Sequence, residues 1–260
     1  QDTGYISGIN NFIYVGAKAF LQGAYSTSTG IMSDNLRSLP LGTPTSQSNF
    51  PNSDPYRVSP YSVSFSHINN SILETINSSV LANQSNSNND IVDWVYLELR
   101  NNVASPGNTI LATRSALIQR DGDIVDVDGV SPVIFNEFSN NKIVCVRHRN
   151  HLGLSLDISN SRIFTSKKSL AFSAPYLVDF RTATDAQLYG PSNAFTTASH
   201  PTLGTVNLLW GGNANMNTNT RFTGLNNDKD YLLINTLGNA TSNHVLNTYH
   251  QSDLNMNKIV

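Results

Sequence analysis

Ile91-Val-Asp-Trp-Val-Tyr-Leu-Glu-Leu-Arg100 is the clearest strand pattern in the chain. Side chains of a β-strand point alternately to its two faces, so Val95, Leu97 and Leu99 share one face. Trp94 and Tyr96 point to the other face, where they either pack in a core or stack on a sugar ring. The alternation predicts a strand with at least one buried face.

Further strands are predicted on both sides of the turn at residues 120–123. Residues 109–119 alternate apolar and polar side chains, Arg120-Asp-Gly-Asp123 supplies a tight turn, and residues 124–127 return as a second strand. Residues 142–148 are rich in β-branched side chains, which favour a sheet. A helix is hard to place, and the best candidate is Ser71 to Ala82. This pattern predicts an all-β fold, an antiparallel β-sandwich.

The composition narrows the class of protein. Charged residues make up 13% of the 260 residues, about half the usual share of a soluble domain. The net charge is -2 and no basic run is present, so we expect no nucleic-acid partner. No apolar stretch approaches the roughly 18 residues that cross a bilayer, so we expect no membrane insertion. Cys145 is the only cysteine, which excludes an intrachain disulfide.

The cell compartment is predicted from the same composition. Asn, Ser and Thr replace charged residues, which is common in secreted β-rich proteins. A chain that begins at Gln1 without Met is expected to have been processed. We therefore predict an extracellular or cell-surface location.

A second pattern lies near the C-terminus, at Asn213-Ala-Asn-Met-Asn-Thr-Asn219. Side-chain oxygens recur at every second position, and an Asp228-Lys-Asp230 pair follows. This layout is typical of a calcium loop, in which oxygen ligands from alternate residues converge on the ion. The candidate ligands are Asn213, Asn215, Asn217, Asn219 through its backbone carbonyl, Asp228 and Asp230. The alternative is that the Asn side chains bond their own backbone and hold no metal.

The pattern begins again at Asp253-Leu-Asn-Met-Asn257, about forty residues later. Recurrence at a fixed spacing predicts a repeat. The second copy has Lys258 where a turn glycine is expected, and its second half is missing. We therefore expect a truncated repeat without a complete site, in a piece of a longer protein.

Several motifs occur in an order that resembles a known module. They are Leu21-Gln-Gly-Ala-Tyr25, Met32-Ser-Asp-Asn-Leu-Arg37, the strand at 91–100, Ala116 to Gly129, and Val146-Arg-His-Arg-Asn-His-Leu-Gly153. The series resembles a hemagglutinin-like or adhesin-like module of large secreted and cell-surface proteins in Bacteroidetes, substrates of the type nine secretion system. In that family the module precedes dockerin-like calcium repeats, to which Trp210 to Asp230 is similar.

The resemblance implies a domain plan. It implies an N-terminal segment at 1–17, a β-sandwich adhesin-like module at 18–205, and a dockerin-like repeat region at 206–260. The family has aspartates where this chain has Asn213 and Asn217, and a glycine where it has Thr218. Amide oxygens bring no charge, which lowers the expected calcium affinity.

The cluster Arg147-His-Arg-Asn-His151 is the most enzyme-like part of the sequence. Strand alternation predicts that Arg147 and Arg149 point together and that His148 points to the opposite face. His148 and His151 are either metal ligands or groups that cap a strand end. No Asp or Glu lies near them at a ligand spacing, which favours the structural role.

Two other groups have a functional and a structural interpretation. Asp121, Asp123, Asp126 and Asp128 are either turn residues or a second cation site, and two Asp-Gly pairs favour turns. Cys145 lies between valines and is expected to be a small buried hydrophobe.

The sequence has no nucleophile elbow, no His-Glu-x-x-His, no phosphate loop and no dinucleotide fingerprint. We therefore predict a non-catalytic binding or adhesion module whose partners are other protein chains or surface glycans. One alternative is a structural packing or spacer subunit of a surface assembly or filament. A weaker alternative is a glycan-active hydrolase that pairs carboxylates such as Asp93 and Glu98.

Overall fold

The computed structural model describes residues 12–37, 50–82, 87–101, 109–137, 142–156, 176–184, 188–189, 195–239, 249–257 and 260. Its strands are β1 (Phe12–Lys18), β2 (Tyr25–Ser26), β3 (Ile31–Met32), β4 (Ile91–Asn101), β5 (Ile110–Gln119), β6 (Asp123–Val125), β7 (Val133–Asn136), β8 (Lys142–His148), β9 (His151–Leu156), β10 (Tyr176–Asp179), β11 (Leu188–Tyr189), β12 (Phe195–His200) and β13 (Gly204–Leu209). The helical segments are short: η1 (Pro55–Arg57), η2 (Tyr61–Val63), α1 (Ser78–Ala82), α2 (Asp228–Asp230) and the π-helical η6 (Tyr231–Thr236). The predicted all-β class is confirmed.

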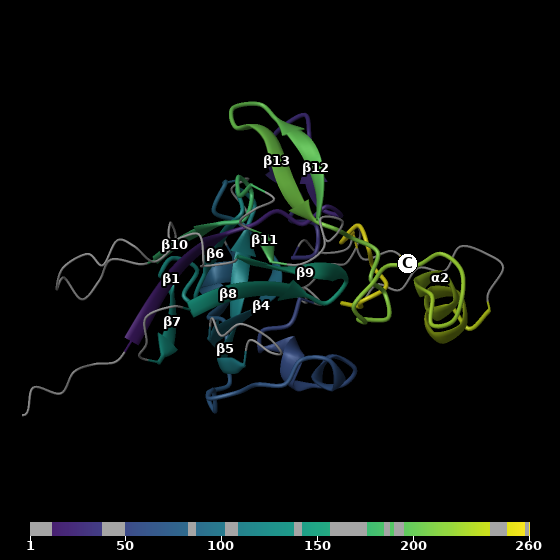
Figure 1. Cartoon of the computed structure of the whole chain (residues 1–260), viewed down its shortest axis with the longest axis horizontal. Helices are drawn as coiled ribbons and strands as arrows, with labels where there is room; N and C mark the ends of the chain where they lie inside the picture. Colours follow the sequence, from purple (N-terminus) through teal and green to yellow (C-terminus); the bar gives the residue numbers. More distant parts are fainter. Residues whose placement is uncertain are drawn as a thin grey trace, which may run out of the picture.

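The main sheet has nine strands in the order β10-β1-β6-β5-β4-β8-β9-β11, with β7 also paired to β1 (Figure 1). The described strand pairs of this sheet are antiparallel except β1 and β10, which run parallel. The strands that we expected in two facing sheets therefore belong to one hydrogen-bonded sheet. In the described chain, no helix is long and apolar enough to cross a membrane.

The predicted hairpin at Asp121-Gly122 is present. Strands β5 and β6 pair at Leu117–Val125 and Ile118–Ile124. Gly122 has φ +92°, a conformation that L side chains rarely adopt, and a Cβ there would lie 2.6 Å from the carbonyl oxygen of Ala19. The turn therefore requires glycine both for its backbone angle and for the close approach of β1's end.

Strand β4 is the centre of the core, because its residues 91–99 are buried on both faces. Segment 50–66 covers one face. Tyr56 donates a hydrogen bond to the Trp94 carbonyl at 3.0 Å, and its ring centroid is 5.5 Å from that of Tyr96. Trp94 and Tyr96 are 0% and 1% exposed, so they are core residues and neither can stack on a sugar.

The helix expected at 71–82 is limited to α1, residues 78–82. Tertiary contacts hold the preceding residues in another conformation. Thr75 forms a β-bridge with Ser53, and the carboxylate of Glu74 accepts a hydrogen bond from Arg114 at 3.0 Å. A buried ion pair and a bridge thus override the weak helical period.

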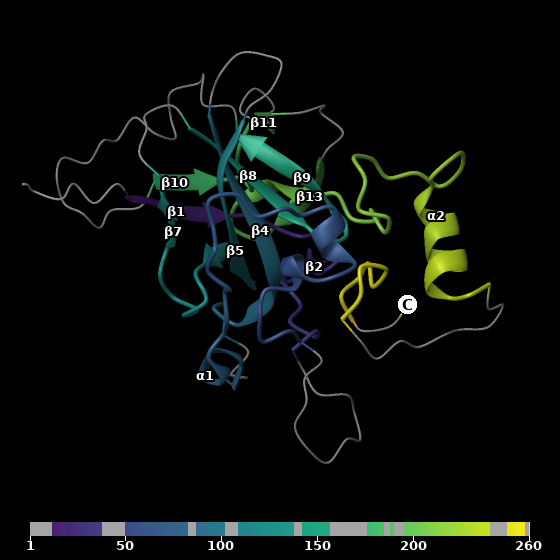
Figure 2. The ribbon, with the colours of Figure 1, turned by 90° about the horizontal axis from the view of Figure 1, so that it is seen from below.

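The strands cross both predicted domain boundaries. Strand β1 spans the boundary after residue 17, and β13 spans the boundary before residue 206. Residues 1–11 of the predicted N-terminal segment lie outside the described residues. The β12–β13 hairpin is tied to the segment after β1, because Leu209 N–H donates to the Phe20 carbonyl at 2.8 Å. Both ribbon views place α2 away from the main sheet, at the other end of the molecule from β1 (Figure 2).

Candidate functional site

The amide loop, residues 213–230, follows β13 and ends in α2. The side-chain oxygen of Asn215 accepts a hydrogen bond from Asn217 N–H at 3.1 Å, and that of Asn217 accepts from Asn219 N–H at 2.7 Å. Each side chain thus caps the backbone two residues further along the chain. Each of these two amide oxygens keeps a second lone pair for another donor or a cation.

Two other amide oxygens of the loop are buried without a hydrogen-bond partner among the described residues, Asn213 Oδ1 and Asn219 Oδ1. Asn213 is fixed across the loop, because its Nδ2 donates to the Asn217 carbonyl at 2.8 Å. A buried acceptor without a donor costs about 1–3 kcal/mol. A cation among these oxygens would remove that cost.

The two aspartates occupy different environments. Asp228 is buried and closes the loop, because its two carboxylate oxygens accept from Asn215 N–H at 3.2 Å and Arg221 N–H at 2.7 Å. The Asp230 side chain is 51% exposed and accepts from Asn227 Nδ2 at 2.7 Å. The structure therefore places Asp228 among the amides and Asp230 at the solvent side of the loop.

The repeat predicted at residues 253–257 has the same local conformation as the start of the amide loop. Met216 and Met256 have φ values of 58° and 56°, which are rare for side chains of this kind. In each copy the methionine N–H lies 3.3 Å from the carbonyl oxygen three residues earlier, of Asn213 and Asp253 respectively. The sequence repeat therefore corresponds to a repeated turn.

Asn150 joins the two turns. Its carbonyl oxygen accepts from Gly212 N–H and Asn213 N–H, each at 3.1 Å. Its side-chain nitrogen donates to the Asp253 carbonyl at 2.7 Å. Because Asn150 is fully buried, it holds the start of the amide loop and the start of the 253–257 repeat in fixed relative positions.

A buried polar cluster lies beside this junction, formed by Asp93, His148, Arg149, His151 and Tyr249. The Asp93 carboxylate accepts from His148 Nε2 at 2.9 Å, Arg149 Nε at 3.1 Å and the Tyr249 hydroxyl at 2.6 Å. Arg149 also donates to the His250 carbonyl, and its guanidinium lies 4.4 Å from the Tyr249 ring centroid. The cluster fastens segment 249–257 to strands β4 and β8.

The hydrogen bonds determine which ring nitrogens carry protons. Gly23 N–H donates to His151 Nε2 at 3.1 Å, so the proton of His151 is on Nδ1. That proton faces Asn150 Oδ1 at 2.7 Å and His148 Nδ1 at 3.0 Å. His148 Nδ1 therefore accepts, and the proton on His148 Nε2 is donated to Asp93.

The protonation states agree with this assignment. Burial lowers the pKa of His148 below its usual range, against the opposing effect of Asp93. Burial, together with His148 and Arg149, lowers the pKa of His151 further. Burial alone would raise the pKa of Asp93, but the charge of Arg149 and the bond from His148 lower it overall. The cluster thus contains neutral histidines around one ion pair.

The prediction that Arg147 and Arg149 point together is wrong. The pairing of β8 with β9 is irregular between Val146 and His148, and Arg149 lies beyond the end of β8. His148 and Arg149 consequently bind the same carboxylate, and Arg147 instead bonds Glu98 at 3.0 Å. The acidic partner that the local spacing did not show is Asp93, on another strand.

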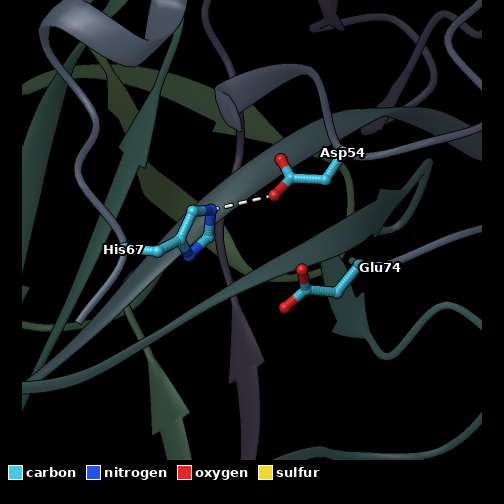
Figure 3. Close-up of side chains that lie close together, drawn as sticks. All are labelled: Asp54, His67 and Glu74. Carbon is cyan, nitrogen blue, oxygen red and sulfur yellow. Dashed lines mark ion pairs between the residues drawn. The ribbon is translucent and has the colours of Figure 1, made fainter. Parts of the chain in front are cut away.

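A second group of titratable side chains, which the sequence did not indicate, comprises Asp54, His67 and Glu74 (Figure 3). Their potential ligand atoms lie within 4.8 Å of one another, and Asp54 Oδ2 is 2.8 Å from His67 Nε2. Arg57 lies 3.2 Å from Asp54, and Arg114 lies 3.0 Å from Glu74. Each carboxylate therefore already has a guanidinium partner, although Arg114 also pairs with Asp126 at 2.9 Å.

The tautomer of His67 also disfavours a metal at this group. Asn70 Nδ2 lies 3.3 Å from His67 Nδ1 and Thr113 Oγ1 lies 3.1 Å from it, and because an amide nitrogen only donates, Nδ1 accepts from Asn70. The ring proton is then on Nε2, 2.8 Å from Asp54 Oδ2, although neither atom makes a well-aligned hydrogen bond among the described residues. A metal would need a lone pair at that nitrogen. The same Asn70 nitrogen bonds Glu74 at 2.6 Å, which fixes the orientation of the amide. This arrangement fits an ion-pair network.

The remaining candidates have structural roles. Asp128 accepts from Val130 N–H at 2.9 Å and Ser131 N–H at 2.8 Å, and Asp121 accepts from Asp123 N–H at 3.1 Å, as turn residues do. Asp126 pairs with Arg114 at 2.9 Å, and Asp123 pairs with Lys18. Burial, then the Glu98 charge, raises the pKa of Cys145 to about 12, so its thiol stays protonated.

Comparison with known proteins assigns no relative to this chain. No family model, no curated protein and no solved structure matches it.

Proposed function

We propose that this chain is a non-catalytic binding or adhesion module of a larger secreted or cell-surface bacterial protein, and that its amide loop binds calcium. The observation that carries the proposal is the pair of buried amide oxygens, on Asn213 and Asn219, that have no partner among the described residues, in a loop closed by Asp228. Calcium takes 6–8 oxygen ligands from carboxylates, amides, backbone carbonyls and water. Asn215, Asn217 and Asp230 complete the proposed set.

The extracellular assignment rests on the resemblance to adhesin-like modules and on the low content of charged residues, 13%. The repeated turn at Met216 and Met256 supports a dockerin-like repeat region at the C-terminal end of the chain. The second copy keeps Asp253 but contributes no complete ligand set.

The state of the titratable groups supports binding over catalysis. Asp93, which a hydrolase would use, is 0% exposed and its charge is balanced by Arg149. Glu98 is also 0% exposed and is held by Arg100 and Arg147. A general acid or base must reach the substrate directly or through one water.

Calorimetric titration of metal-free protein with calcium tests the proposal. We expect measurable heat and a higher melting temperature, since a ligand at a hundredfold excess over Kd adds about 2.7 kcal/mol of stability. Asp230→Asn keeps the acceptor for Asn227 but removes a charge, and we expect affinity to fall about tenfold or more. Asp128→Asn, in a turn outside the loop, is the matched control. The absence of both heat and a melting shift at millimolar calcium would overturn the proposal.

A structural packing role is the second candidate, and the exposed apolar side chains of one segment favour it. Four apolar side chains on segment 55–75 are well exposed: Val58 at 56%, Val63 at 84%, Ile72 at 69% and Leu73 at 55%. Large apolar side chains that a segment leaves exposed are candidates for contact with another chain. Analytical ultracentrifugation of the wild type and of Val63→Ser/Ile72→Ser decides between the roles. Self-association that the double change abolishes would favour packing, and a monomer at all concentrations would reject it.

A further inference from the structure

A pocket of about 470 Å³ lies between the amide loop and η6. Pockets that hold small molecules usually measure about 300–1,000 Å³. This pocket is lined by Asn215, Asn217, Asn226, Asn227, Asp230, Tyr231, Ile234 and Asn235. Small-molecule sites are mostly apolar, so a lining of this many amides points to a ligand that needs many hydrogen bonds.

Part of this lining is fixed in place. Asn215 Oδ1 accepts from Asn217 N–H at 3.1 Å, and Asn215 Nδ2 donates to the Asn226 carbonyl at 2.8 Å. The amide plane of Asn215 is therefore held by bonds at both ends. Each end keeps one unused hydrogen-bonding position, because an amide oxygen has two lone pairs and an amide nitrogen two protons.

Two other lining residues are available to a ligand. Asn226 and Asn235 are exposed, and their side chains have no hydrogen-bond partner in the described part of the chain. An amide presents a donor and an acceptor side by side, which matches two neighbouring hydroxyl groups. These two amides offer that arrangement without first breaking a protein–protein bond.

Charge and shape narrow the ligand class. Asp230 is the one charged residue among the lining residues, and no lysine or arginine is among them, so an anionic ligand is disfavoured. Tyr231 and the half-exposed Ile234 add an aromatic and an aliphatic surface. A saccharide combines hydroxyl groups with an apolar C–H face, and an aromatic ring beside amides suits both.

We propose that this pocket binds a neutral saccharide, through the amides of Asn226 and Asn235 and the ring of Tyr231. The inference rests on the proposed binding function and specifies its ligand. Asn215 and Asn217 belong to both the pocket and the proposed calcium set, so a bound ion stiffens one wall. Saccharide affinity is then higher with calcium than with chelator.

The test is calorimetric titration of the full chain with a panel of neutral mono- and oligosaccharides, in calcium and in chelator. We expect at least one saccharide to bind, with affinity reduced about tenfold in Asn235→Ala, which removes hydrogen bonds to the ligand. Alanine is a good helix former, so this change should leave η6 folded. Asn136→Ala, an exposed change on β7, is the matched control and should bind like the wild type.

The possible failures are distinguishable. Calcium binding with no response to any saccharide overturns the inference and leaves the proposed function intact. Saccharide binding that is equal in the wild type, in Asn235→Ala and in Asn226→Gly overturns the pocket assignment. If the wild type gives no heat on titration with calcium, the proposed calcium function is overturned. Saccharide titration in chelator then tests the pocket independently of calcium.

Discussion

Asp93 is the residue on which the buried polar cluster depends. It is the acceptor for His148, Arg149 and Tyr249, and it carries the negative charge that pairs with the Arg149 guanidinium. Breaking a buried ion pair by removing one partner leaves an uncompensated charge, which costs about 3–5 kcal/mol. We therefore expect Asp93→Asn to lower the free energy of unfolding by about that amount in urea denaturation.

The matched control is Asp123→Asn. Asp123 also pairs with a cation, Lys18, but its side chain is 36% exposed. An exposed ion pair contributes only about 0–1 kcal/mol, because water and salt screen it. Equal losses of unfolding free energy in the two variants would show that Asp93 does not compensate a buried charge.

Segment 249–257 behaves as a structural element although it contains no helix or strand. Gly23 makes its docking possible, since a Cβ at that position would lie 1.9 Å from the Leu254 carbonyl oxygen. We expect Gly23→Ala to displace this segment while the main sheet stays folded. Hydrogen exchange measures this directly, with faster exchange at the Asp253 and Met256 amides and unchanged protection in β4.

Gly211→Ala is the control for that change. Its nearest contact would be 3.3 Å, to the ring of His151, which is tight but not prohibitive. Faster exchange throughout β4 in Gly23→Ala would contradict a local role for the segment.

The sequence predicted those strands and turns whose signals lie within a few neighbouring residues. The strands at 91–100 and 109–119 and the turn between 119 and 123 were predictable, because alternation and an Asp-Gly pair lie within a few residues. The parallel pairing of β1 with β10 was not, since Val15 and Tyr176 are remote in the chain. The periodicity of a sequence does not indicate a contact between residues so far apart.

The same distinction between local and remote signals applies to the candidate site. The amide loop was visible because its oxygens recur at alternate positions of one segment. The buried cluster was not, because Asp93 and His148 come from different strands. One signal was present, however: a carboxylate within the apolar run Ile91-Val-Asp-Trp94 must find a partner in the core.

The whole molecule combines two kinds of polar structure, the buried polar cluster beside strands β4 and β8 and the amide loop. The amide loop leads to α2, which both ribbon views place away from the main sheet (Figure 2). Asn150 connects the cluster and the loop, because it bonds His151 in the cluster, Asn213 in the loop and Asp253 in the docked segment. Loss of the cluster should therefore disturb the loop, and acid is the simplest way to titrate the cluster.

We expect the stability of the whole chain to fall as the pH drops below about 6.5. Burial lowers the pKa of His148, His151 and His250 in the folded state, so the unfolded chain binds more protons in this range. Stability from these groups is fully present above the unfolded pKa and is lost on acidification, by up to about 1.4 kcal/mol per pH unit for each fully buried histidine. The lowered pKa of Asp93 acts only below about pH 4.

Melting curves between pH 7.5 and 5, recorded in chelator so that calcium loss does not contribute, measure the effect. His148→Gln keeps a nitrogen donor facing Asp93 and removes one titrating group, so its melting temperature should fall less steeply below pH 6.5 than that of the wild type. A flat wild-type profile over this range would mean that the buried histidines do not stay neutral. In that event the hydrogen-bond directions assigned from Gly23 through His151 and His148 to Asp93 would be wrong, because a charged His148 would need an acceptor for its second ring proton.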